Sequence, residues 1–216
     1  MAVVAKICGL RTAEAVRAAI EGGARYVGFV SYQPSPRHIP FHEAEKLAEL
    51  VPAHVLRVGL FVDPDDDLLG EWLEGGALDM LQLQGSETAA RVARIRDIAE
   101  LPVMKAIRVA TRADVEQAIA TYGNVVDRLM FDAAPLPSDQ AALPGGNGAP
   151  FDWRILEGIE MPRPWMLSGG LTPENVAAAV RATGARAVDV SSGVESARGV
   201  KSVERIRSFL AETAKL

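Results

Sequence analysis

The sequence predicts an α/β fold: a single-domain (β/α)8 TIM barrel with parallel strands, spanning residues 1–216. Short apolar runs recur along the chain, and most are apolar at successive positions, which is typical of strands buried on both faces. Helical patterns separate the runs, so the strands should pair in parallel through right-handed crossovers. The predicted strands are 3–8, 26–30, 56–62, 80–83, 103–109, 128–132, 165–168 and 187–191. Eight strand-helix units in one domain favour a closed barrel.

Helix-start signals and apolar stripes justify the helices between these strands. Apolar residues at helical spacing mark helices around residues 15–20, 44–51, 68–73, 92–99, 115–119 and 203–210. Side chains that can accept hydrogen bonds from a first helical turn precede several of them. The candidate caps are Thr12, Ser86, Thr111 and Asp152, with Thr172-Pro173-Glu174 as a further start signal.

An open, doubly wound sheet is the competing fold. Such a sheet often carries a Gly-x-Gly-x-x-Gly turn after its first strand, and nucleotide-binding versions carry a Gly-x-x-x-x-Gly-Lys loop. This sequence has neither motif. The barrel therefore remains the better interpretation.

Composition narrows the class of protein. The net charge of −5 argues against a nucleic-acid surface, because phosphate-backbone binding needs a concentrated basic face. The single cysteine cannot form an internal disulfide, so we expect a reducing cytoplasmic location. We also expect neither a signal peptide nor a membrane span, because no apolar stretch is long enough.

Chemically active residues should gather where the strands end. The carboxyl ends of all barrel strands meet at one mouth, where the active sites of this fold lie. Two long connections, residues 31–41 and 133–150, lie on the same face, and loops of such length are usually functional or disordered. The residues at the strand ends are Cys8, Arg37, Asp63, Gln84, Arg108, Asp132, Ser168-Gly169-Gly170 and Ser191-Ser192-Gly193.

Two glycine-containing loops follow the seventh and eighth strands. Glycine lets the backbone approach a ligand, and free amide groups favour an anion. Phosphate sites after strands seven and eight are frequent in this fold. Gly169-Gly170 and Ser192-Gly193 are therefore candidate phosphate-binding residues, although each pair could simply form a tight turn.

Cys8 and Asp132 are the candidates for proton transfer. A thiol acts as a base only as the thiolate, so nearby positive charge should lower its pKa. Lys6 is two residues before Cys8 and points to the same side of the strand. A partly buried aspartate can act as an acid if burial raises its pKa. Alternatively, Cys8 is a small buried hydrophobe and Asp132 caps a loop.

Charged residues elsewhere in the barrel have two interpretations each. Arg37 lies between prolines and suits a forked contact with a carboxylate, or it is a solvated surface residue. Asp189 should face the barrel interior, where its charge needs a partner or a ligand hydroxyl. Lys6 or Lys105 could pair with Asp189, or Lys105 could form a Schiff base.

We predict no metal site and no cofactor. The three histidines are His38, His42 and His54, and no set of carboxylates completes a ligand cluster with them.

Taken together, the motifs resemble phosphoribosylanthranilate isomerase of tryptophan biosynthesis. The matches run in order from Lys6 to Lys201 and cover nearly the whole chain. The matching segments are Lys6-Ile7-Cys8-Gly9-Leu10, Gly28-Phe29-Val30, Ser35-Pro36-Arg37, Arg57-Val58-Gly59-Leu60-Phe61-Val62, Gly145-Gly146-Asn147-Gly148 with Phe151-Asp152-Trp153, Leu167-Ser168-Gly169-Gly170-Leu171 with Pro173-Glu174-Asn175-Val176, and Asp189-Val190-Ser191-Ser192-Gly193-Val194-Glu195.

This resemblance implies an Amadori rearrangement of N-(5-phosphoribosyl)anthranilate to 1-(2-carboxyphenylamino)-1-deoxyribulose 5-phosphate, an aldose-ketose isomerisation without a cofactor. By match to the family motif, Asp132 would be the general acid and Cys8 the general base. Arg37 would hold the anthranilate carboxylate and Asp189 would help position the sugar. The Gly169-Gly170 and Ser192-Gly193 loops would bind the phosphate. The expected partner is this small phosphosugar substrate, with no nucleic acid or membrane, and the protein would be a monomer or homodimer.

One position departs from the family pattern. The family usually has Gln-Leu-His-Gly after the fourth strand, where this chain has Gln82-Leu83-Gln84-Gly85. Glutamine keeps hydrogen-bonding capacity but does not titrate near neutral pH. Two other functions stay open: a lyase or aldolase that uses Lys105, and a non-catalytic sugar-phosphate binding module.

Overall fold

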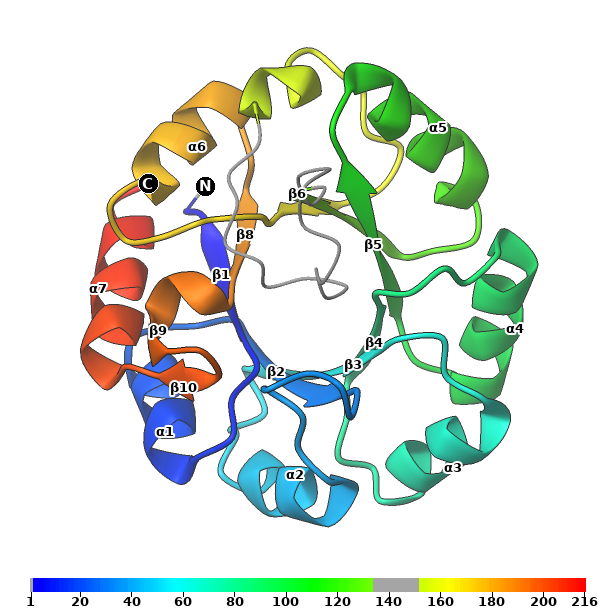
Figure 1. The fold of residues 1–216 in the computed structure, drawn as a ribbon, viewed down its shortest axis with the longest axis vertical. Helices are drawn as coiled ribbons and strands as arrows, with labels where there is room; N and C mark the ends of the chain where they lie inside the picture. Colours follow the sequence, from blue (N-terminus) through cyan, green and yellow to red (C-terminus); the bar gives the residue numbers. More distant parts are fainter. Residues whose placement is uncertain (1, 134–151) are drawn as a thin grey trace.

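A computed structural model gives the fold and describes residues 2–133 and 152–216. Within these ranges eight parallel strands close into a barrel in sequence order, from β1 to β8 and back to β1, with the α-helices on the outside (Figure 1). The predicted barrel is therefore confirmed. Most of the connection at 133–150, with its Gly145-Gly146-Asn147-Gly148 motif, lies outside the described residues, as does Phe151.

All eight predicted strands are present, with ends that differ from the prediction by at most one residue. The strands are β1 Val4–Cys8, β2 Tyr26–Ser31, β3 Leu56–Phe61, β4 Met80–Leu83, β5 Val103–Val109, β6 Arg128–Ala133, β7 Trp165–Leu167 and β8 Ala187–Val190. The first and last strands close the barrel, with Lys6 opposite Asp189 in the register. A short antiparallel hairpin that the sequence patterns did not predict follows β8, formed by β9 Glu195–Ala197 and β10 Val200–Lys201.

The helices cover the outer face of the barrel. They are α1 Ala13–Glu21, α2 Phe41–Ala48, α3 Asp66–Glu74, α4 Ala89–Ala99, α5 Arg112–Tyr122, α6 Val176–Thr183 and α7 Val203–Thr213, with short 3-10 helices η1 Trp153–Leu156 and η2 Ser192–Val194. The predicted caps Thr12, Thr111 and Asp152 each accept a hydrogen bond from a first-turn amide. These three caps are confirmed.

Two predicted helix starts are wrong. Thr88, not Ser86, caps α4, because the helix begins at Ala89 and Thr88 Oγ1 accepts the Arg91 amide, while Ser86 lies in the preceding loop and donates its amide to Asp63 Oδ1 at 2.7 Å. At the other site, α6 begins at Val176 after Asn175 rather than at Thr172. Asn175 Oδ1 accepts the Thr172 amide at 2.8 Å and Thr172 Oγ1 accepts the Glu174 amide at 3.2 Å, so the residues after Thr172 form a hydrogen-bonded turn that precedes the helix.

The apolar core has two main parts, besides a small third cluster of Cys8, Val30 and Leu60 near the carboxyl ends of β1 to β3. Most of it lies between the barrel and the helices, where Trp72 of α3 packs edge-on against Phe61 of β3, with ring centroids 5.5 Å apart. A second cluster fills the lower barrel interior and includes four methionines, at positions 80, 104, 130 and 166. Methionine fills irregular gaps because its chain is flexible and unbranched.

Inside the barrel the character of the side chains changes from apolar to polar toward the carboxyl ends. Successive inward-facing residues are two apart along a strand. On β6, Met130 lies in the apolar layer and Asp132 lies above it. On β4, Met80 is followed by Gln82, and Gln84 comes directly after the strand. The fold therefore places a polar site on top of an apolar plug.

Candidate active site

The polar site lies at the mouth formed by the carboxyl ends of the strands. The structure brings Cys8 from β1, Asp132 from β6, Ser168 after β7 and Asp189 from β8 into one buried cluster. Positions 124 residues apart in the chain, Cys8 and Asp132, thus belong to one site, as the barrel topology predicted.

A buried ion pair anchors this cluster. Lys6 Nζ contacts Asp189 Oδ1 at 2.8 Å, and the lysine side chain is fully buried. Ser168 Oγ donates to Asp189 Oδ2 at 3.1 Å, so both carboxylate oxygens have a partner. Burial opposes the charge on Lys6, but Asp189 and Cys8 outweigh it and raise the lysine pKa. The predicted pairing of an interior lysine with Asp189 is confirmed for Lys6.

Cys8 ends β1 and is 4% exposed. Gly28 of β2 makes room for it, since a Cβ at Gly28 would lie 3.1 Å from both Cys8 Sγ and Lys6 Nζ. Burial raises the pKa of the Cys8 thiol, while the nearby charge of Lys6 lowers it, Asp189 raises it and Lys201 lowers it. The expected effect of Lys6 is present, but the expectation of a lowered pKa is wrong because desolvation is the larger effect.

Asp132 is a buried carboxyl with a pKa raised to about 6. Burial is the main cause, and the charge of Asp189 adds to it. Hydrogen bonds from the Ala133 amide at 2.9 Å and from Gln84 Nε2 at 3.1 Å act in the opposite direction, as does the charge of Arg108. A carboxyl with these properties holds a proton at mildly acidic pH and can donate it.

The two glycine loops pack against each other and against the end of β6. Gly169 and Gly170 have φ of 89° and 62°, a left-handed backbone that favours glycine. A Cβ at Gly169 would lie 2.5 Å from the Ala133 amide nitrogen, and one at Gly193 would overlap the Leu171 carbonyl oxygen. Gly169, Gly170, Ser192 and Gly193 are only partly buried and follow two adjacent strands, β7 and β8, and their binding of a phosphate stays a prediction.

Arg37 is held in a network that sequence reasoning missed. Its Nε and Nη2 contact Glu195 Oε1 and Oε2 at 2.7 and 3.0 Å, a forked ion pair. Lys201 Nζ contacts the same Glu195 at 2.9 Å and the Ser191 carbonyl at 2.8 Å. Glu195 and Lys201 lie at the two ends of the β9–β10 hairpin, so their opposite charges across a short turn were the one available sequence signal.

Lys105 does not face the barrel interior, contrary to our expectation. It lies between Met104 and Ala106, which point inward, so the two-residue period turns it toward the helices. Its Nζ contacts Glu87 Oε2 at 2.9 Å and donates to the carbonyls of Gly85 and Ala106 at 2.8 and 3.1 Å. These contacts occupy the amine that a Schiff base would need.

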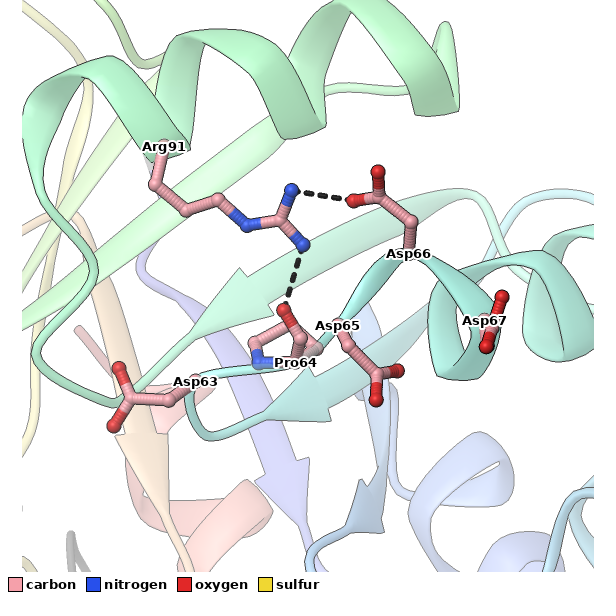
Figure 2. A pocket seen from close by; sticks show the side chains of 6 residues that line it. All are labelled: Asp63, Pro64, Asp65, Asp66, Asp67 and Arg91. Atoms are coloured by element: carbon pink, nitrogen blue, oxygen red, sulfur yellow. Dashed lines mark hydrogen bonds and ion pairs between the residues drawn. The ribbon is translucent and has the colours of Figure 1, made fainter.

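Two hollows open near the barrel mouth. One, of about 230 Å³, is lined by residues at the ends of β3, β4 and β5, among them Asp63, Gln84 and Arg108. The other, of about 480 Å³, lies between the β3–α3 loop and α4 (Figure 2). There Arg91 bonds Asp66 at 2.5 Å and the Pro64 carbonyl at 2.7 Å (Figure 2). Neither Cys8 nor Asp132 lines either of these two hollows.

Residues 2–133 and 152–216 contain no group of three side chains that could hold a metal ion. In the same described part of the chain, every helix is too short or too polar to cross a membrane.

Comparison with known proteins identifies the family. A family model for N-(5'-phosphoribosyl)anthranilate (PRA) isomerase matches residues 5–212. The chain belongs to this family. It is 56% identical over 211 residues to the N-(5'-phosphoribosyl)anthranilate isomerase of Paracoccus denitrificans, covering 98% of this chain and 97% of the relative. The enzyme of the same name from Rhodospirillum centenum is 53% identical over the whole of both chains.

Solved structures that carry the same enzyme name have the same fold as this chain. The phosphoribosyl anthranilate isomerase of Thermotoga maritima superposes with a TM-score of 0.87 at 32% identity, covering 99% of this chain and 100% of that chain. A phosphoribosyl anthranilate isomerase in complex with reduced 1-(o-carboxyphenylamino)-1-deoxyribulose 5-phosphate gives a TM-score of 0.85 with the same identity and coverage. The predicted family resemblance is therefore confirmed.

The raised pKa of Asp132 predicts a gain in stability when its charge is removed. Its pKa is about 6 in the fold against an ordinary value of 3.8, so the folded state binds the proton more tightly and ionisation costs stability as pH rises from about 4 to 6. Asp132→Asn should raise the free energy of unfolding at pH 7.5 by up to about 3 kcal/mol, since one pKa unit is about 1.4 kcal/mol. Urea unfolding at pH 7.5 and pH 4 measures this.

The gain should shrink to about 0.5 kcal/mol at pH 4, where Asp132 is protonated in the folded state and partly protonated in the unfolded state. Asp97→Asn, at an exposed position on α4, is the matched control and should change little at either pH. A gain of equal size at both pH values would show that the cause is not the ionisation of Asp132.

Proposed function

We propose that this protein, as one barrel unit spanning residues 1–216, converts N-(5-phosphoribosyl)anthranilate to 1-(2-carboxyphenylamino)-1-deoxyribulose 5-phosphate. Family membership supports the reaction. The observation that carries the mechanism is the pairing of a buried thiol and a buried carboxyl of raised pKa at one barrel mouth. No external oxidant is needed, because C2′ of the substrate is oxidised as C1′ is reduced.

Asp132 acts first, as the general acid. Its proton passes to the ribose ring oxygen as the C1′–O bond breaks, and the nitrogen lone pair forms a Schiff base with C1′. The pKa of about 6 suits this step, since an acid works best when its pKa is near the operating pH. The hydrogen bonds from Ala133 and Gln84 then stabilise the carboxylate that remains.

Cys8 acts second, as the general base. The thiolate removes the C2′ proton and the electron pair forms the C1′–C2′ double bond of an enolamine. The enolamine tautomerises to the ketone, which leaves the product with the same atoms as the substrate. Lys6 and Lys201 favour the thiolate by their charge, and both are held in place by carboxylates.

Acid and base are best described as a coupled pair. The active form has one proton, on Asp132 and not on Cys8, and the competing form carries that proton on Cys8 instead. Both forms have the same net charge, so pH does not interconvert them, and the local charges decide between them. Activity should therefore depend on the total number of protons on the pair.

The remaining predicted residues would bind the substrate. The anthranilate carboxylate would approach Arg37, whose cationic head is kept at the mouth by Glu195. Asp189 would accept a sugar hydroxyl, and Gly169, Gly170, Ser192 and Gly193 would bind the phosphate through backbone amides and the serine hydroxyl. Two loops on adjacent strands bring these four residues together.

We further propose a cytoplasmic protein that is a monomer or homodimer. The single cysteine fits a reducing compartment. One structural relative is described as a dimeric phosphoribosylanthranilate isomerase from which monomers were generated. Size-exclusion chromatography with light scattering measures the oligomeric state directly.

The decisive experiment follows the fluorescence of phosphoribosylanthranilate as purified protein consumes it. Cys8→Ser and Asp132→Asn should each lower kcat about 10²- to 10⁴-fold, because a positioned acid or base contributes a factor of that size. Asp97→Asn is the surface control and should keep full turnover. Near-normal kcat in both active-site variants would contradict the mechanism.

Two alternative functions, a sugar-phosphate binding module and a lyase, predict other outcomes. A sugar-phosphate binding module would bind substrate without any decay of fluorescence. A Lys105 lyase would leave substrate attached to Lys105 after borohydride reduction, detected by mass spectrometry of the digested protein.

The coupled pair predicts a bell-shaped pH profile of kcat/KM. The rate should fall below about pH 6, where both groups are protonated, and again above the ordinary pKa of a thiol, where both are ionised. Stopped assays from pH 4.5 to 10.5 measure it. In Asp132→Asn the plateau should be lost, and the residual activity should rise with pH up to the pKa of the Cys8 thiol. A break near pH 6 that persists in this variant would belong to the substrate phosphate, whose second pKa is also about 6. A steady decline from pH 6 to 9 would contradict the pairing.

Arg37→Ala should raise KM about 10- to 100-fold and change kcat less, because a hydrogen bond to a charged group contributes about 1.5–3 kcal/mol to binding. Glu195 keeps Lys201 as a partner in this variant, so the fold should survive. Arg17→Ala, at an exposed position on α1, is the control. An unchanged KM would remove Arg37 from the carboxylate site.

A further inference from the structure

A chain of two glutamine side chains leads through the barrel interior to Asp132. Gln82 Nε2 donates to Gln84 Oε1 at 2.6 Å, and Gln84 Nε2 donates to Asp132 Oδ2 at 3.1 Å. Gln82 lies on β4, Gln84 directly follows the last residue of that strand, and both side chains are buried. The chain of hydrogen bonds therefore runs from the apolar plug up to the proposed acid.

The orientation of the Gln84 amide decides what it does to Asp132. A carboxamide has a donor end and an acceptor end. The donor end stabilises a carboxylate, whereas the acceptor end would stabilise the protonated acid. The isolated side chain could present either end to Asp132, so some other group must select one.

Gln82 makes this selection. Its Nε2 occupies Gln84 Oε1, so the other end of Gln84, the NH₂ group, faces Asp132. Gln82 is 1% exposed, and the same Nε2 lies 3.6 Å from Met130 Sδ. Among the described residues, its Oε1 has no hydrogen-bond partner. A buried acceptor without a partner costs stability, so stability alone does not explain a glutamine at this position.

We propose that Gln82 and Gln84 are positioning residues for the general acid: Gln82 fixes the Gln84 amide as a donor, and Gln84 in turn orients the Asp132 carboxyl and tunes its acidity. This inference rests on the proposed role of Asp132. Since a glutamine does not titrate, the device works without adding a charge to a site that is already crowded with charges.

Charged groups also act on Asp132 from two other strands. Asp189 on β8 favours the protonated acid, and Arg108 on β5 favours the carboxylate. On β1, Lys6 is paired with Asp189, next to Cys8. None of these groups is altered by changing the two glutamines, so the contribution of the amides can be isolated.

The experiment is a double-mutant cycle on the intact chain with Gln82→Met, Gln84→Met and both together. The titration of Asp132 is followed by the NMR signal of its ¹³C-labelled carboxyl, assigned with Asp132→Asn. Gln84→Met should raise the midpoint by about one pH unit, because it removes a hydrogen bond to a charged group. Gln82→Met should also raise it, because the Gln84 amide is then free to turn its acceptor end to Asp132. In the Gln84→Met background, Gln82→Met should add nothing.

A purely structural role would weaken folding without moving this midpoint. An unchanged midpoint in Gln82→Met, or an equal shift with and without Gln84, would overturn the proposal. Gln117→Met, which removes an exposed glutamine bonded to Thr121, is the matched control and should leave the midpoint unchanged. The acid limb of kcat/KM should move in parallel with the midpoint in each variant.

A second measurement needs no variant. In the unaltered protein, the Gln84 side-chain NH₂ signals should shift with pH at the midpoint of Asp132. Signals that do not titrate would overturn the proposal even if the methionine variants fail to fold. Both NMR readouts are independent of turnover, so a protein that leaves phosphoribosylanthranilate unconverted would refute the proposed function while the glutamine chain is judged separately.

Discussion

The buried ion pair of Lys6 and Asp189 is the interaction on which the site depends. These residues are register partners on the two strands that close the barrel, and their charges meet at 2.8 Å in its interior. Such a pair is weak evidence for stability, because desolvating two charges offsets much of their attraction. The pair instead sets the charges around the proposed acid and base. Lys6 acts on Cys8, Asp189 acts on Asp132, and Ser168 is tied in through Asp189. One pair thus links four strands at the mouth.

Burial destabilises the charged forms of the side chains in this site. Burial raises the pKa of both Cys8 and Asp132. The charges of Lys6 and Lys201 lower the pKa of the thiol. Ala133, Gln84 and Arg108 lower the pKa of the carboxyl. The apolar methionine layer beneath provides the low-dielectric floor that makes these few neighbours effective. Stability and reactivity are therefore in tension at Asp132, as is common for groups whose pKa is matched to a reaction.

A second network braces the rim. Glu195 joins Arg37 from the loop after β2 to Lys201 on the β9–β10 hairpin. Gly199 in that hairpin lies so close to Pro36 that a Cβ there would be 2.7 Å from the Pro36 carbonyl oxygen. The hairpin and the Arg37 loop therefore support one another, and the position of the arginine depends on residues more than 150 positions away in the chain.

The sequence by itself determined the eight strands, because runs of buried residues and helical stripes are local patterns, and it placed Lys6 beside Cys8 through the two-residue period of a strand. Once the barrel was inferred, Cys8, Asp132 and the glycine loops had to share one mouth. Only the tertiary structure decided the partners. Lys6 rather than Lys105 pairs with Asp189, and Arg37 makes a forked ion pair with Glu195. Gln82 donates a hydrogen bond to Gln84. Burial has a larger effect than Lys6 on the pKa of Cys8. These outcomes depend on distances between strands and on exclusion of water, and neither quantity is encoded in any local stretch of residues. For the same reason Ser86 and Thr172 look like helix caps in sequence, whereas in the fold both lie in loops before helices that begin at Ala89 and Val176.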